Sequence, residues 1–137
     1  MATFTKFNSF VESLAEKVHN LGSDTLTVAL CAAASAPVAG NTILANLTQI
    51  SYTNLSARVI TTTTSAQTAG TYKLVLADLV LTASGAVATF RYVVIYNDTA
   101  ASDELIAFFD YGSNVTMANG DTFTLDFDGV NGLLQLA

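Results

Sequence analysis

The sequence predicts a mainly β fold, an antiparallel jelly-roll-like β-sandwich with one N-terminal amphipathic α-helix. Segments in which apolar and polar residues alternate recur from residue 24 onward, as in half-buried strands. Turn dipeptides such as Asn119–Gly120 and Asp128–Gly129 separate these segments. Before Gly22, apolar residues recur at helical spacing instead. We therefore expect one domain over residues 1–137, with the helix at 5–21 and the sandwich at 24–137.

The predicted N-terminal helix has one apolar face and a sequence signal at each end. Ser9 and Glu12 fit a capping box, although Thr3 or Thr5 could begin the helix a turn earlier. Gly22 is a natural residue to end it. The stripe is expected to pack against the sandwich or a sister subunit. It consists of Phe7, Phe10, Val11, Leu14, Val18 and Leu21.

The strands are expected to be short and connected by turns. Residues 25–31 alternate, with Leu26, Val28 and Leu30 on one face and threonines and Ala29 on the other, which predicts a half-buried strand. Residues 71–82 and 86–97 are expected to form a hairpin around Ser84–Gly85. Both faces of the second segment are apolar near Val93–Tyr96, so it should be central and covered on both sides.

Other segments complete a predicted set of seven or eight strands. Strands are expected at 105–111, 121–128 and 132–136, with weaker ones near 47–53 and 57–64. The alanine-rich stretch around Pro37 and the segment 61–70 (TTTTSAQTAG) are expected to be loops.

Charged residues are scarce. They make up 12% of the 137 residues, and the stretch 25–57 between Asp24 and Arg58 contains none. A compact chain of this mass exposes about 6,800 Å², so its 16 charges (5 basic and 11 acidic) would be spread at one per roughly 425 Å². Such a surface suits contact with other proteins, which indicates a component of an assembly.

Composition also argues against several classes of protein. The net charge is −6, and the five cations are scattered singly, so we expect neither nucleic acid nor an anionic membrane as a partner. Lys6, Glu12, Glu16 and Lys17 interrupt any apolar signal-peptide core, and we expect no membrane span. The single Cys31 rules out an internal disulfide, which fits folding in a reducing cytoplasm.

The candidate chemical residues have simple structural interpretations. His19 is interpreted as a surface residue near a helix C-terminus, although a catalytic base is the alternative. Cys31 is interpreted as a small buried hydrophobe, and one Cys with one His cannot build a zinc site. Arg91 lies within an apolar strand, and Asp110 is its expected ion-pair partner. No nucleotide-binding or hydrolase motif occurs, so we expect no enzymatic activity and no cofactor.

The carboxylates near the C-terminus leave one alternative open. Asp121, Asp126 and Asp128, with Asp110 on another strand, could supply oxygen ligands to calcium, but their spacing does not match an EF-hand loop. Paired acids also serve glycoside hydrolysis, yet the chain has no Trp to line a sugar cleft. The simpler interpretation is that these carboxylates lie on the wet face of a sheet.

Several segments resemble small virion proteins of tailed bacteriophages, in particular head cement, or decoration, proteins. These segments are FNSFVESLAEKVHNLGSDTL (7–26), GTYKLVLADLVLTASG (70–85), FRYVVIYNDT (90–99), FFDYGS (108–113) and NGDTFTLDFDGVNGLLQLA (119–137). The resemblance spans nearly the whole chain, but it involves strand cores and turns and includes no catalytic signature.

The resemblance implies a jelly-roll-like protein that binds the outer capsid surface as a homo-oligomer, a dimer being favoured over a trimer. Its partner would be the major capsid protein, and it would be made in the host cytoplasm. A tail or baseplate component is one alternative, and a sugar- or calcium-binding β-sandwich for host attachment is another. The last would need a pocket with aromatics, which Tyr52, Tyr72, Tyr92, Tyr96 and Tyr111 could supply, although four of the five fall in strand patterns.

Overall fold

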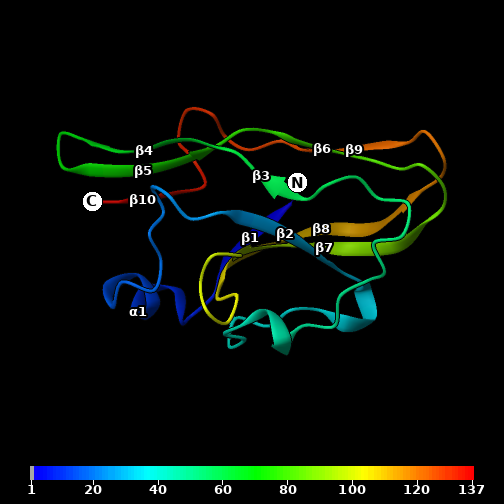
Figure 1. Cartoon of the computed structure of the whole chain (residues 1–137), viewed down its shortest axis with the longest axis horizontal. Coiled ribbons are helices and arrows are strands. Elements are labelled where there is room, and N and C mark those ends of the chain that lie inside the picture. The colour runs from blue at the N-terminus through cyan, green and yellow to red at the C-terminus, as the bar shows by residue number, and fades with distance from the viewer. Residues whose placement is uncertain (1) are drawn as a thin grey trace.

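The chain folds into two facing layers of antiparallel strands (Figure 1). The computed structural model describes residues 2–137, of which 47% are strand and 9% helical, so the mainly β prediction is confirmed. The larger layer is a five-stranded sheet in the order β1, β8, β7, β2, β3. These strands span Thr3–Lys6, Leu105–Met117, Val87–Asn97, Leu26–Cys31 and Val59–Ile60, respectively.

The facing layer contains a three-stranded sheet and a two-stranded sheet. The order of the first is β10, β5, β4, and the second pairs β6 with β9. These strands span Leu134–Leu136, Thr71–Leu76, Thr62–Thr68, Leu79–Thr82 and Thr122–Leu125, respectively. The short helix α1 (Phe10–Ala15) lies below the β4–β5 hairpin in Figure 1. Within residues 2–137, no helix combines the length and apolarity needed to cross a bilayer.

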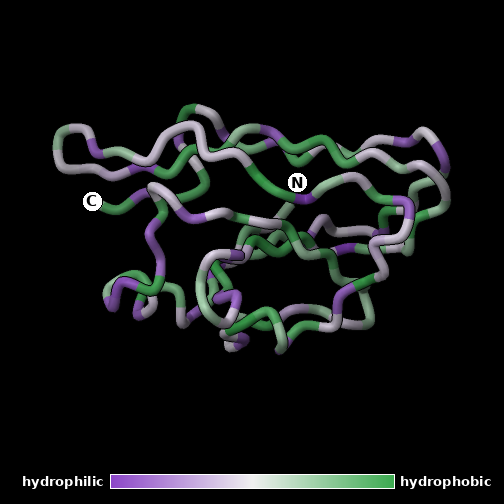
Figure 2. Tube along the Cα trace, in the orientation of Figure 1, coloured by the Kyte–Doolittle hydropathy of each residue, from purple (hydrophilic) through white to green (hydrophobic). Residues whose placement is uncertain are grey.

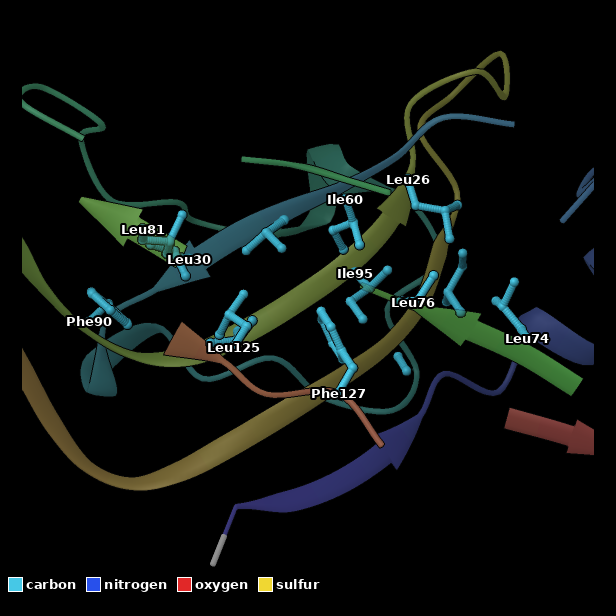
Figure 3. Close-up of a cluster of buried hydrophobic side chains, with 14 of the residues drawn as sticks. Leu26, Leu30, Ile60, Leu74, Leu76, Leu81, Phe90, Ile95, Leu125 and Phe127 are labelled. Carbon is cyan, nitrogen blue, oxygen red and sulfur yellow. The ribbon is translucent and has the colours of Figure 1, made fainter. Parts of the chain in front are cut away.

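The main core lies between the two layers. Figure 3 shows side chains from both layers pointing into it, among them Leu26, Leu30 and Ile95 from the larger sheet and Leu74, Leu76 and Leu125 from the other layer. A second cluster lies on the opposite face of the larger sheet, where the loop with the 3-10 turns η1 (Ala33–Ser35) and η2 (Leu44–Asn46) covers it. The larger sheet is therefore covered on both faces.

This double cover corrects the prediction for the first core strand. β2 is buried along its whole length and is not half-exposed. Leu26, Val28 and Leu30 enter the main core, whereas Ala29 and Cys31 enter the second cluster. Alternation along the strand therefore separates two cores here, with the larger side chains of β2 in the main core and the smaller ones in the second cluster.

The central position predicted for residues 86–97 is confirmed, but the hairpin is wrong. β7 pairs with β2 on one side and with β8 on the other, and Val93 and Val94 are buried on opposite faces. The segment predicted as its hairpin partner divides instead into β5 and β6, which belong to the facing layer. Local turn signals at Ser84–Gly85 indicate a change of direction, but they do not determine the partner of a strand.

The predictions for two segments before residue 71 are wrong. Residues 61–70 were predicted to be a loop, yet Thr62–Thr68 forms β4, because β5 offers a paired edge to a threonine-rich segment. Figure 2 shows this hairpin in mostly pale colours, which means intermediate hydropathy. No strand forms within 47–53. The strands predicted at 105–111, 121–128 and 132–136 are present as β8, β9 and β10.

The predicted helix at 5–21 is wrong in its extent. Residues Thr3–Lys6 pair with β8 as strand β1, and the backbone N–H of Phe7 then donates to Ile106 at 3.1 Å. The helix begins only at Phe10 and ends at Ala15, shortly before Lys17 takes a positive φ of 66°. The first turn of the expected helix is therefore extended instead. Pairing with the edge of β8 provides hydrogen-bond partners for its backbone N–H and C=O groups.

Candidate interaction surface

The six residues of the predicted apolar stripe do not form one surface. Phe7 is buried in the second cluster, whereas Phe10 and Leu21 are buried in the main core, where Leu14 packs at the margin. Val11 and Val18 are 53% and 36% exposed. Leu14, Val18 and Leu21 also line a groove of about 600 Å³ between the α1–β2 segment and the underside of the β4–β5 hairpin. Most residues of the stripe therefore pack inside the protein, and only some of them remain exposed for contact with a partner.

Next to this groove lies a buried polar cluster formed by His19, Asp24 and Asn97. The Asn97 side-chain amide donates to Oδ2 of Asp24 at 2.6 Å and lies 3.0 Å from Nδ1 of His19. Its oxygen accepts the backbone N–H groups of Thr99 and Ala100 at 3.0 and 3.2 Å. These contacts fix the amide orientation, so Nδ1 of His19 is the acceptor and the imidazole is neutral. The cluster ties the end of β7 to the segment before β2.

His19 is therefore not the surface residue that the sequence predicted. It is only 4% exposed, and its ring lies 5.3 Å from that of Phe10. Burial lowers the pKa of His19, and the negative charges of Glu104 and Asp24 only partly counter this effect. No sequence signal indicated the cluster, because the burial of Asn97, which makes its amide require partners, is visible only in the structure.

Cys31 is placed as predicted, in an apolar setting. Its side chain is fully buried in the second cluster, and burial raises the pKa of the thiol to about 11. A thiol with so little thiolate at neutral pH is a poor nucleophile.

The predicted pair between Arg91 and Asp110 is present. Nε of Arg91 donates to one carboxylate oxygen of Asp110 at 2.7 Å, and Nη2 donates to the other at 2.9 Å. The Arg91 guanidinium, with help from the backbone N–H of Gly112, lowers the pKa of the Asp110 carboxyl. The pair joins neighbouring strands β7 and β8.

The acidic residues near the C-terminus are engaged separately in turns. Asp128 accepts backbone N–H groups of Val130 and Asn131 together with the Asn131 amide, and these bonds lower its pKa. Asp121 accepts the backbone N–H of Ala118 at 2.8 Å. Within residues 2–137, no three acidic, His or Cys side chains are grouped so that they could hold a metal ion. The carboxylates therefore serve local turns or, in the case of Asp126, face outward.

A hollowed surface appears where the two layers are open along one side. Two adjoining hollows of about 190 and 260 Å³ share Phe109, Asp126 and Phe127 as lining residues. We call this surface the aromatic groove. It is lined by Ala2, Phe4, Val93, Phe109, Tyr111, Phe123, Thr124, Leu125, Asp126, Phe127, Asp128, Gly132 and Leu133.

Aromatic pairs within the larger sheet and across the two layers form the floor of the aromatic groove. Tyr111 of β8 meets Phe123 of β9 edge-on, with 5.3 Å between ring centroids. Phe109 lies 6.5 Å from Phe127 and 5.3 Å from Phe4. Phe4 and Tyr111 nevertheless remain 43% and 46% exposed. Exposed aromatic residues that gather around a hollow are typical of a contact surface, in contrast to apolar residues scattered singly.

Sequence reasoning missed this surface. Of the five tyrosines considered as possible pocket residues, Tyr111 is the one that lines the aromatic groove. Phe123 and Phe127 belong to the alternating segment 121–128, and such alternation has the same pattern whether the facing layer covers these side chains fully or only partly. The chain matches no protein-family model, no curated protein and no solved structure.

Proposed function

We propose that this chain is a structural virion protein of a tailed bacteriophage, which binds the outer capsid surface and cements neighbouring capsomers. The observation that carries the proposal is the charge-poor surface. The folded chain exposes 6926 Å² and carries 16 charges, one per roughly 430 Å², which is close to the value expected from composition. Large protein contacts favour such surfaces, because buried charge is costly at their centres.

The sign of the charge and the segment resemblance support an outward position. A net charge of −6 disfavours contact with packaged DNA, whose phosphates would repel the protein. The segments quoted above resemble head cement proteins along nearly the whole chain. The finer fold assignment, a jelly-roll-like sandwich, belongs to the same proposal, and so do a dimeric state and the major capsid protein as partner.

The proposal predicts a gain in particle stability. A protein that binds the assembled shell but not the dissociated subunits stabilises the shell by mass action. Heads that lack the protein should assemble, lose integrity at a lower temperature than complete heads, and recover when the purified protein is added. Equal melting temperatures of heads with and without the protein would refute the cementing role. A cryo-EM map that shows density only on the tail would instead support the tail or baseplate alternative.

A further inference from the structure

The aromatic groove is bordered by strand edges without a neighbour in the described part of the chain. β9 pairs only with β6, and β1 pairs only with β8. The last β1 partner on β8 is Asp110, although β8 continues to Met117. Edge strands offer backbone N–H and C=O groups that another extended segment can pair with.

Two of these edges, unlike β1 with its Lys6, carry neither charge nor proline. The β8 segment 111–117 (YGSNVTM) and the strand β9 (TFTL) contain no charged residue and no proline. Natural proteins commonly guard exposed edges with lysine or proline to prevent pairing with other chains. Unprotected edges beside exposed aromatic side chains indicate a surface that a partner covers.

The charge of the aromatic groove selects the kind of partner. Its charged lining residues, among the residues described, are Asp126 and Asp128, with no Lys or Arg. Asp128 is occupied by hydrogen bonds from its own turn, whereas Asp126 has no such partner within residues 2–137. A second copy of this chain would bring acidic residues against acidic ones, at a net charge of −6 each. A basic residue opposite Asp126 would be attracted instead.

We propose that the aromatic groove binds an extended segment of a different protein, which carries alternating aliphatic side chains and a Lys or Arg that pairs with Asp126. The segment adds a strand at the open side, and its aliphatic side chains enter the two hollows beside Tyr111 and Phe127. Side chains two residues apart along a strand point the same way, which suits adjoining hollows. That this partner is a capsid protein rests on the proposed function, whereas the binding chemistry does not.

A peptide titration tests the binding chemistry. The probe is acetyl-Lys-Val-Thr-Val-Lys-Val-Thr-amide, added to the ¹⁵N-labelled full-length protein up to millimolar concentration and followed by NMR. Shifts are expected in β9 and in residues 111–117 of β8. The matched peptide with glutamate in place of lysine should bind at least about fivefold more weakly, because it faces Asp126 with like charge.

Protein variants locate the site. Tyr111→Ala should weaken peptide binding about tenfold, as expected for an aromatic anchor of a contact surface. Asp126→Asn should weaken it about two- to fivefold, the range of an exposed ion pair. Glu12→Gln, which removes an exposed charge on α1, is the matched control and should bind as the wild type does. Far-UV circular dichroism and melting curves establish that each variant is folded.

Several outcomes would overturn the inference. These are the absence of peptide binding, shifts that map elsewhere, and equal affinity of Tyr111→Ala and wild type. A concentration-dependent dimer that Tyr111→Ala abolishes would show that a second copy occupies the aromatic groove. Particles separate this result from the proposed function. If wild type and Tyr111→Ala bind heads equally, the cementing role stands and the aromatic groove is not its contact. If neither binds heads, the cementing role fails while peptide binding still decides the inference.

Discussion

Replacing Asn97 with alanine should destabilise the protein strongly, because this fully buried amide has four polar contacts. The variant leaves His19, Asp24 and the backbone N–H groups of Thr99 and Ala100 without their partner. A typical hydrogen bond contributes about 0.5–1.5 kcal/mol net. Some of these groups lie near the surface and can recover water, so we expect a loss of about 2–4 kcal/mol in the free energy of unfolding.

Such a loss is large on the scale of a domain, whose stability is typically about 5–15 kcal/mol. It corresponds to a fall of about 10 °C in Tm for a chain of this size. Urea denaturation followed by circular dichroism measures it directly. Asn114→Ala, on an exposed part of β8, is the matched control and should remain within about 0.5 kcal/mol of wild type. If Asn97→Ala were equally stable, the polar cluster would not hold β7 to the segment before β2.

Burial lowers the pKa of His19, so folding favours the neutral imidazole. This contribution to the free energy of unfolding is present above pH 6.5 and declines as the pH falls. Replacing His19 with Gln should flatten that part of a profile of unfolding free energy against pH. Phe10→Ala should cost about 3–5 kcal/mol, whereas Val11→Ala, one residue further along the same helix, should cost less than about 0.5 kcal/mol. Comparable losses in urea melts would show that the helix faces another way. Cys31, buried and with a pKa of about 11, should resist iodoacetamide in the native protein and react fully in urea, as mass spectrometry would detect. Melting curves in EDTA and in millimolar calcium should coincide, and a rise of several degrees that Asp126→Asn abolishes would contradict this.

The sequence predicted the positions of several strands well. Alternation at 25–31 and 121–128 indicated the strands that the structure contains as β2 and β9, and the apolar segment 86–97 indicated β7. The run of apolar residues at Val93–Tyr96 also indicated correctly that β7 is central. These features depend on the period of the side chains along a strand, which is a local property of the chain.

Partner choice was not predictable from the same residues. The turn near Gly85 suggested a hairpin, yet β6 pairs with β9 and β7 pairs with β8. The threonine-rich segment of β4 was predicted to be a loop, but it forms a strand because it pairs with β5. In the same way, the apolar residues near Phe7 have helical spacing, yet the segment before Phe7 forms strand β1. Its backbone pairs with the edge of β8. Pairing depends on contacts distant in sequence, so local signals do not determine it.

By itself, the sequence determined the mainly β character, the scarcity of charge and the burial of Cys31, because these follow from composition and side-chain period. Only the tertiary structure decided which apolar residues remain exposed. Phe4 contacts Phe109 from more than 100 residues away in the chain, and Tyr111 of the larger sheet contacts Phe123 of the facing layer. Together these four residues line the aromatic groove. The buried cluster around Asn97 has the same origin, since His19 and Asp24 lie more than 70 residues from Asn97 along the chain. A surface or a polar cluster assembled across such distances is a property of packing, and no local pattern encodes it.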